Sequence, residues 1–152
     1  MILRKEFRFE ASHRLPFHQG KCARLHGHSW TLEVEVEGPV DPLTGMVMDF
    51  ADINSYIDPV VWELDHHHLG TWEGMSIEFI REWGVPWLRA NFNATCENLL
   101  WAIAERLSKA LPWSRLVLHE TCTSEAALTK GEFLKGRKEA FNAEAALSRN
   151  LP

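Results

Sequence analysis

The chain lacks three features, each typical of a different class of protein. Basic residues are not in surplus: 16 Lys and Arg stand against 21 Asp and Glu, a formal net charge of −5. A nucleic-acid-binding domain normally carries a basic patch or stripe, so we expect no such function. No apolar run approaches the roughly 20 residues of a membrane-spanning helix. The three cysteines are odd in number and show no framework spacing, which argues against a disulfide-stapled secreted domain.

Targeting segments, internal repeats and low-complexity tracts are also missing. The segment Met1 to Glu6 resembles the beginning of a strand and contains no apolar stretch typical of a signal peptide. We therefore expect a cytoplasmic protein that does not associate with membranes. A length of 152 residues, with 45% hydrophobic and 24% charged residues, predicts one soluble globular domain over residues 1–152.

Apolar residues at every second position predict the strands. Strict alternation favours strands over residues 2–14 and 28–37, joined by a loop that contains Cys22. Residues 38–45 are rich in turn-forming residues, and a short strand is expected after them at 46–50. A further strand is expected at 115–123.

Helices are expected where apolar residues recur at three- and four-residue spacing. The resulting order of strand, strand, short strand, helix, helix and strand predicts an α+β fold. It is an antiparallel four-stranded sheet with two main helices on one face. Such a small sheet leaves exposed edges, which oligomerisation can cover. The expected helix signals are Asp52 as the first N-cap, Pro59 as a kink or early end, Gly70 as a stop, a short helix over 76–83, Thr95 as the next N-cap, Pro112 as its end, and an appended helix after Gly131.

Three histidines are predicted to share one face of the sheet. His26 and His28 are separated by one residue, so both side chains point to the same side of a strand. The alternation of apolar residues in both strands places this pair and His13 on the apolar face of the sheet. Three neutral imidazoles with an open fourth position are typical of catalytic zinc, whereas isolated histidines in such places are more often hydrogen-bonded core residues. Gly27 would allow close approach of another backbone or a ligand.

A second constellation is the run Asp65-His66-His67-His68. A carboxylate beside an imidazole can orient it and raise its basicity, giving a general acid or base near neutral pH. Three consecutive histidines fit a solvated helix end equally well, because a cation there suits the helix dipole. They fit extra metal ligands less well, because adjacent side chains diverge. A zinc-storage function of this run would require more than one zinc per chain.

Cys22 and Glu120 are the remaining candidates for chemistry. The loop of Cys22 carries Lys21 and Arg24, and cationic neighbours favour the reactive thiolate; the alternative is a small buried hydrophobe. Glu120 lies on a largely apolar strand, where a carboxylate needs a partner. That partner is either a ligand with two parallel N–H donors or an internal cation, and the sequence does not distinguish the two.

Five motifs, in order over residues 7–70 and 95–125, resemble the 6-pyruvoyl-tetrahydropterin synthase family. Within that family they are similar to the branch that makes 6-carboxy-5,6,7,8-tetrahydropterin for queuosine (7-deazaguanine) biosynthesis. The motifs are Phe9-Glu-Ala-Ser-His13-Arg-Leu-Pro, Cys22-Ala-Arg24-Leu-His26-Gly-His28-Ser, Asp41-Pro-Leu-Thr-Gly45 before Met48-Asp49-Phe50, Leu64-Asp65-His66, and Glu120-Thr-Cys-Thr.

The resemblance implies a tunnelling fold (T-fold) in which subunits surround a central barrel, as a homohexamer of two trimers or another homo-oligomer, with pockets between subunits. It implies conversion of 7,8-dihydroneopterin triphosphate to 6-carboxytetrahydropterin, acetaldehyde and triphosphate, with one Zn²⁺ per subunit. The implied roles are zinc binding for His13, His26 and His28, a catalytic thiolate for Cys22, proton relay for Asp65 with His66, and anchoring of the pterin ring for Glu120.

The spacing Cys-x-x-x-His-Gly-His, with Arg24 inside it and a short preceding loop, resembles the carboxy-type branch. The pyruvoyl-type synthase, which eliminates triphosphate without cleaving the side chain, is the alternative within the family. The alternative from another functional class is a zinc- or pterin-binding relative that keeps the pocket but has lost turnover. Arg14, Lys21 and Arg24 form a local basic group that we expect to meet the triphosphate.

The chain departs from the family pattern in four places. Gly70 stands where the family usually has Asn, and Ala94 stands where it usually has Pro. Residues 71–92 are expected to be an insertion, and residues 131–152 a C-terminal extension. These departures concern loop geometry, subunit packing and substrate access rather than the zinc, cysteine or Asp-His positions.

Overall fold

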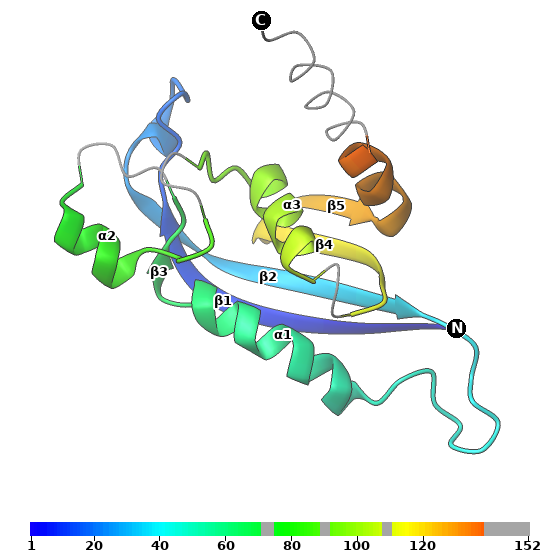
Figure 1. The fold of residues 1–152 in the computed structure, drawn as a ribbon. Helices are drawn as coiled ribbons and strands as arrows, with labels where there is room; N and C mark the ends of the chain where they lie inside the picture. The colour runs from blue at the N-terminus through cyan, green and yellow to red at the C-terminus, as the bar shows by residue number, and fades with distance from the viewer. Residues whose placement is uncertain (71–74, 89–91, 108–110, 139–152) are drawn as a thin grey trace, which may run out of the picture.

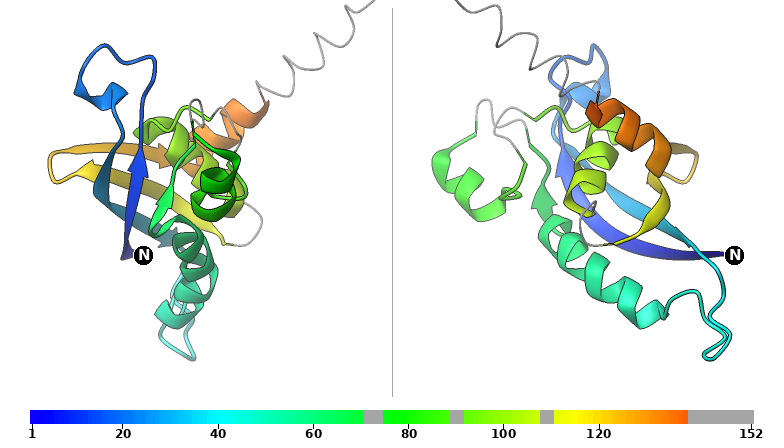
Figure 2. Two further views of the ribbon diagram at one scale, coloured as in Figure 1. Left: turned by 90° about the vertical axis from the view of Figure 1, so that its left-hand side faces the viewer. Right: turned by 45° about the vertical axis from the view of Figure 1, so that its right-hand side comes forward.

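The computed structural model describes residues 1–70, 75–88, 92–107 and 111–138 (Figure 1). A five-stranded sheet with strand order β3-β1-β2-β4-β5 forms one layer. Helices α1 and α3 lie on one face of this sheet (Figures 1 and 2). The strands are β1 (Ile2–His13), β2 (His26–Glu37), β3 (His67–His68), β4 (Trp113–Thr121) and β5 (Ser124–Thr129), and the helices are η1 (Lys21–Ala23), α1 (Phe50–Leu64), α2 (Ile77–Trp83) and α3 (Cys96–Leu107).

The α+β architecture with a mainly antiparallel sheet is confirmed, but the sheet has five strands rather than four. All neighbouring strands are antiparallel except β3, which pairs in parallel with β1. Strands β3 and β5 were not expected, because β3 has two residues and β5 lacks a run of large apolar side chains. Both form only because a longer strand offers them an edge to pair with.

The hairpin of β1 and β2 is the frame that positions the site. Its antiparallel register pairs Phe9 with Trp30 and His13 with His26. The predicted alternation is confirmed, since both aromatic side chains are buried in the core and their rings lie 6.1 Å apart. The register therefore brings the end of β1 beside the beginning of β2, where the predicted metal ligands lie.

The strand expected at 46–50 is wrong. Val47 and Met48 form a bend, and Phe50 is the first residue of α1. The expected N-cap Asp52 is also wrong: Asp49 caps the helix, its carboxylate accepting the Ala51 N–H at 2.8 Å. Residues 46–50 thus have a strand-like composition but pair with no strand of the sheet.

Helix α1 continues through Pro59 for 15 residues, so the expected early end is wrong. Its buried stripe, which includes Ile57 and Leu64, holds both halves of the helix against β1. The helix ends at Leu64 with Asp65 as its C-cap, rather than at Gly70. Packing of an apolar face thus outweighs the loss of one backbone hydrogen bond at proline.

The other expected helices agree with the structure where it describes them. Ser76 caps α2, accepting the Phe79 N–H at 3.2 Å, and Thr95 caps α3, accepting the Asn98 N–H at 3.3 Å. Residues 130–138 are helical, as expected for the beginning of the appended helix. The remainder of that helix and the expected end of α3 before Pro112 fall partly outside the described residues. No helix in the described ranges is long and apolar enough to cross a membrane.

Candidate functional site

The three predicted metal ligands lie together at one end of the β1–β2 hairpin. His13 is the last residue of β1 and faces His26, the first residue of β2, in the antiparallel register. His28 follows two positions later on the same side of β2. One nitrogen of each of the three imidazoles lies within 4.8 Å of the others, a grouping that can hold a metal ion.

Backbone carbonyls orient two of these rings. The Nδ1 atom of His13 lies 2.7 Å from the Ala94 carbonyl oxygen, and the Nδ1 atom of His26 lies 2.7 Å from the Arg24 carbonyl oxygen. Since a carbonyl only accepts, both Nδ1 atoms carry the proton and both Nε2 atoms keep a lone pair. This outer arrangement is typical of metal-binding histidines.

All three Nε2 atoms, those of His13, His26 and His28, are buried and make no hydrogen bond within the described part of the chain. Burial lowers the pKa of His13 to about 4, although the hydrogen bond to Ala94 opposes the shift. Burial also lowers the pKa of His28, opposed by the nearby Glu120 carboxylate. At neutral pH the rings of His13 and His28 are therefore uncharged, which is the form that binds a metal ion. The alternative of hydrogen-bonded core histidines does not account for three unpartnered nitrogens.

Gly27, between His26 and His28, allows β1 and β2 to approach closely, as the sequence predicted. A Cβ atom at this position would lie 3.2 Å from the Ala11 carbonyl oxygen of β1. That contact is tighter than ordinary van der Waals separation, so a side chain would push β1 away from β2. The glycine therefore preserves the separation of His13 from His26 and His28.

Glu120 on β4 points toward this histidine cluster. Its Oε1 atom lies 3.6 Å from Nε2 of His13 and 4.0 Å from Nε2 of His28. Glu120 also lines a pocket of about 310 Å³ together with Glu97 and Glu125. Three carboxylates around one pocket suit a ligand that presents several N–H donors. An internal salt bridge to Lys or Arg does not occur for Glu120 among the described residues.

Sequence reasoning missed Glu97 and Glu125. Glu97 lies in the first turn of α3, where an acidic residue is expected for the helix dipole alone, and so gave no separate signal. Glu125 lies on β5, a strand that was not predicted. Glu125 is brought to Glu120 by the tight turn between β4 and β5, and Glu97 by the packing of α3 against these strands.

The Asp65–His66 pair is held tightly where α1 ends. The Oδ2 atom of Asp65 lies 2.9 Å from Nδ1 of His66, while Oδ1 accepts the Glu10 N–H at 2.7 Å. Burial would raise the pKa of Asp65, but the Glu10 amide and His66 together hold it below its ordinary value. His66 has a φ of +60°, a left-handed conformation that is uncommon for a residue with a side chain. The carboxylate therefore orients an imidazole whose other nitrogen is open to solvent.

The histidine run divides into three different environments. His66 is 76% exposed, whereas His68 is buried, with its Nδ1 atom 3.0 Å from the Ser12 hydroxyl. His67 belongs to β3, and its Nδ1 atom lies 2.8 Å from the Asp65 carbonyl oxygen. Only His66 therefore fits the alternative that the histidine run is a solvated helix end. Among the described residues, none of the three joins the metal-binding group.

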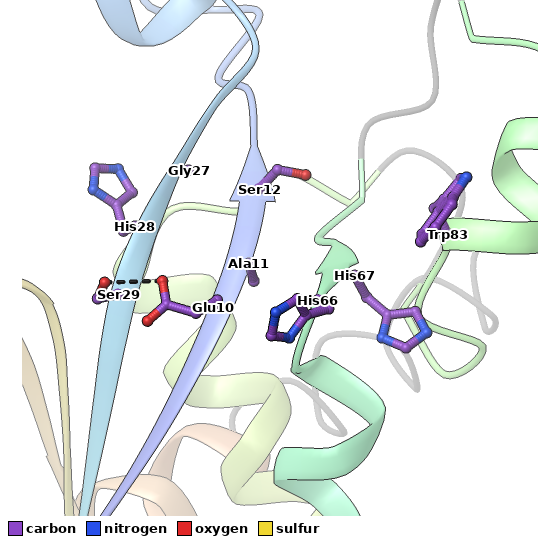
Figure 3. A pocket seen from close by; sticks show the side chains of 9 residues that line it. All are labelled: Glu10, Ala11, Ser12, Gly27, His28, Ser29, His66, His67 and Trp83. Carbon is purple, nitrogen blue, oxygen red and sulfur yellow. Dashed lines mark hydrogen bonds between the residues drawn. The ribbon is translucent and has the colours of Figure 1, made fainter.

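A pocket of about 400 Å³ lies beside the Asp65–His66 pair (Figure 3). His66 and His67 line it from one side, and Trp83 of α2 stands opposite the end of β3. The ring of His28 points away from these side chains, on the other side of β2 (Figure 3). His28 is also among the residues that line this pocket, but within one chain its ring and the ring of His66 lie on opposite sides of the hairpin (Figure 3).

Cys22 is half-buried on η1, in the loop between β1 and β2 and at the same end of the hairpin as His13 and His26. Lys21 and Arg24 beside it are exposed. Cys96 is a different kind of thiol: burial, with the Glu120 charge, raises its pKa to about 11, and its Sγ atom donates to the Leu118 carbonyl. Cys22 is thus the cysteine that lies in the loop with these cationic side chains, at the end of the hairpin that carries the histidine cluster.

Comparisons with known proteins agree with this geometry. The chain is 39% identical over 127 residues to a 6-carboxy-5,6,7,8-tetrahydropterin synthase of Synechocystis, covering 72% of this chain and 98% of the relative. It is 37% identical over 108 residues to a 6-pyruvoyl tetrahydrobiopterin synthase of Poecilia reticulata, covering 67% and 65%.

Similarity extends to the fold. The solved structure of the 6-pyruvoyl tetrahydropterin synthase of Caenorhabditis elegans superposes with a TM-score of 0.66 at 24% identity, covering 85% of this chain and 94% of that one. The profile of the family described as 6-pyruvoyl tetrahydropterin synthase matches residues 2–131. This chain therefore belongs to the 6-pyruvoyl tetrahydropterin synthase family, a family of enzymes with the T-fold.

Proposed function

We propose that this protein is a zinc-dependent 6-carboxy-5,6,7,8-tetrahydropterin synthase. It would convert 7,8-dihydroneopterin triphosphate to 6-carboxy-5,6,7,8-tetrahydropterin, acetaldehyde and triphosphate. The observation that carries the proposal is the convergence of three buried, unpartnered Nε2 atoms beside the carboxylate of Glu120. The carboxy-type relative supports this branch, because the alignment covers nearly its whole length.

The donor set of His13, His26 and His28 fits zinc. Three neutral imidazole nitrogens leave a fourth position open, as in catalytic rather than structural zinc sites. When bound, zinc would supply Lewis-acid chemistry toward the hydroxyl groups of the substrate side chain. We propose one Zn²⁺ per subunit, because the remaining histidines of the run 66–68 lie in other environments.

Glu120 would anchor the pterin ring. Its carboxylate lies at the edge of the histidine cluster and lines a pocket with two further carboxylates, Glu97 and Glu125. The amino and ring N–H groups of a pterin are parallel donors that a carboxylate accepts in pairs. The ring would then lie in the pocket, with its side chain directed toward the histidines.

Cys22 and the Asp65–His66 pair would move protons to and from the side-chain carbons. Asp65 holds Nδ1 of His66, so that Nε2 is the atom that exchanges a proton with the substrate. Since the rings of His66 and His28 lie on opposite sides of the hairpin within one chain, we propose that the working site forms between subunits (Figure 3). A homohexamer of two trimers, or another homo-oligomer, would bring His66 of one copy to the cluster of the next.

The triphosphate would contact the exposed guanidinium of Arg24, with Arg14 and Lys21 in the same loop region. Replacing Arg24 should raise KM more than it lowers zinc content, and the opposite result would exclude this role. We further propose that residues 71–92 are an insertion and that residues 131–152 are a C-terminal extension. The protein would act in queuosine biosynthesis, in the cytoplasm.

The deciding experiment is incubation of the zinc-loaded protein with 7,8-dihydroneopterin triphosphate, with products identified by mass spectrometry. A Cys22→Ala variant with unchanged zinc content is the control. Acetaldehyde and 6-carboxytetrahydropterin, both lost in the control, are the expected result. A pyruvoyl product would assign the pyruvoyl-type reaction instead. Absence of turnover with one zinc bound would leave a zinc- or pterin-binding relative.

A further inference from the structure

The pocket beside the Asp65–His66 pair contains two side chains that the proposed reaction does not yet use. They are His67 on β3 and Trp83 at the end of α2, both of which line the same space as His66 (Figure 3). The Nδ1 atom of His67 lies 2.8 Å from the carbonyl oxygen of Asp65, so Nδ1 carries the proton and donates. Its Nε2 atom therefore keeps a lone pair. Asp65 thus orients two imidazoles, His66 through its carboxylate and His67 through its carbonyl.

Trp83 is held in place although it is 44% exposed. Gly84, the next residue, forms a parallel bridge with His68 of β3. The ring of Phe79, also on α2, lies 6.0 Å from the ring of His68. The helix that carries Trp83 is therefore fastened to the strand that carries His67. An indole held at a pocket wall and half open to water is typical of a ligand contact.

The chemistry of the pocket wall favours a hydroxylated carbon chain. The His67 Nε2 atom is an acceptor on this wall, and the Glu10 carboxylate is a second one that already accepts the Ser29 hydroxyl at 2.8 Å and keeps further lone pairs. The described residues that line the pocket include neither Lys nor Arg, and a carboxylate opposes a phosphate group. Acceptors bind O–H groups, and the flat face of Trp83 can cover the C–H side of the same chain.

We propose that His67 and Trp83 bind the hydroxylated side chain of the pterin substrate. Nε2 of His67 accepts a hydrogen bond from a side-chain hydroxyl, and the indole of Trp83 packs against the carbon chain. The inference rests on the proposed function, because a substrate atom that exchanges a proton with His66 must lie within hydrogen-bond reach of that ring. The reacting side chain then occupies this pocket. Helix α2, inside the predicted insertion 71–92, becomes an element that selects hydroxylated over apolar side chains.

The test compares two pterins that share the ring and differ in the side chain. Neopterin carries three hydroxyl groups and 6-methylpterin carries none, and their binding to the zinc-loaded full chain is measured by equilibrium dialysis. Trp83→Ala should raise the neopterin Kd about tenfold, the size of one lost ring contact, and Trp83→Phe should restore most of the affinity. His67→Phe should weaken neopterin about tenfold while leaving 6-methylpterin within about twofold, since only one hydrogen bond is lost. Trp62→Ala, which removes an 80% exposed tryptophan from α1, is the matched control.

An unchanged preference for neopterin over 6-methylpterin in both the Trp83→Ala and His67→Phe proteins would overturn the inference, as would failure of the wild-type chain to bind neopterin. Circular dichroism shows whether each variant is folded, and an unchanged preference in His67→Phe alone overturns the inference if Trp83→Ala does not fold. Turnover of 7,8-dihydroneopterin triphosphate is assayed separately. If the chain turns over the triphosphate but the variants keep the preference for neopterin, only this inference is refuted. If the variants lose that preference but the wild-type chain shows no turnover, only the proposed reaction is refuted.

Discussion

Replacing Asp65 with asparagine should abolish most activity while leaving the fold nearly intact. In the native protein the carboxylate accepts from Nδ1–H of His66 at 2.9 Å and from the Glu10 amide at 2.7 Å. In Asp65→Asn, the amide oxygen can still accept the Glu10 N–H, but the amide nitrogen then faces Nδ1 of His66 and donates to it. The imidazole proton moves to Nε2, which can no longer take a proton from the substrate.

The expected loss follows from this change of tautomer. An equivalent Asp→Asn change in a Ser-His-Asp triad lowers kcat by about 10⁴, and we expect a fall of about 10³ to 10⁴ here. The stability cost is that of one charge-assisted hydrogen bond made neutral, about 1 kcal/mol. That cost corresponds to a Tm lower by a few degrees, about 2 to 4 °C for a chain of this size.

The assay measures kcat and KM for 7,8-dihydroneopterin triphosphate near neutral pH, and Tm by calorimetry. The pKa of Asp65 lies below its ordinary value, so its stabilising effect is present above the unfolded-state pKa and is lost as the pH falls through the lower folded-state pKa. The carboxylate is therefore ionised under assay conditions. Asp58→Asn, the same change at an exposed position of α1, is the control. Activity of Asp65→Asn within tenfold of wild type would refute the reasoning.

Three further predictions concern the metal, the core and the thiols. His13→Ala should reduce bound zinc, measured by atomic emission, from one per chain to a trace and remove the Tm increase on zinc addition; full retention would exclude His13 as a ligand. Phe133→Ala, at a fully buried ring 5.5 Å from that of Trp113, should lower the free energy of unfolding by about 3–5 kcal/mol in urea titrations, and a cost under about 1 kcal/mol would contradict the packing. Cys96, with its pKa raised to about 11 by burial, should resist iodoacetamide at mildly alkaline pH while the exposed Cys122 reacts, as peptide mass mapping would show.

Much of the candidate site could be predicted from the sequence because its parts are local to one hairpin. Period-two alternation places His26 and His28 on one face of β2, and the odd register of β1 places His13 on the facing strand. The close approach at Gly27 follows from the same local geometry. The contact of Asp65 with His66 also lies within two neighbouring residues, so sequence adjacency alone made it plausible.

Errors arose where long-range contacts decide the local structure. Residues 46–50 have strand-like composition but no sheet edge to pair with, whereas β3 and β5 have weak patterns and do pair. Helix α1 passes through Pro59 because its apolar stripe is buried against β1. Local propensity is worth a few tenths of a kcal/mol per residue, less than the burial of a single large side chain, about 1.5–3 kcal/mol.

The sequence by itself determined the family, the grouping of three histidines that can hold a metal ion, and the hairpin that carries them, since alternation along a strand is dictated by backbone geometry. Only the tertiary structure decided which side chains share a pocket. It brought Glu97 and Glu125 to Glu120, and Trp83 to His67. It also placed the His66 ring on the opposite side of the hairpin from the His28 ring (Figure 3). The physical reason is that pockets form where elements distant in the chain pack together, and the energy of that packing is absent from any local pattern.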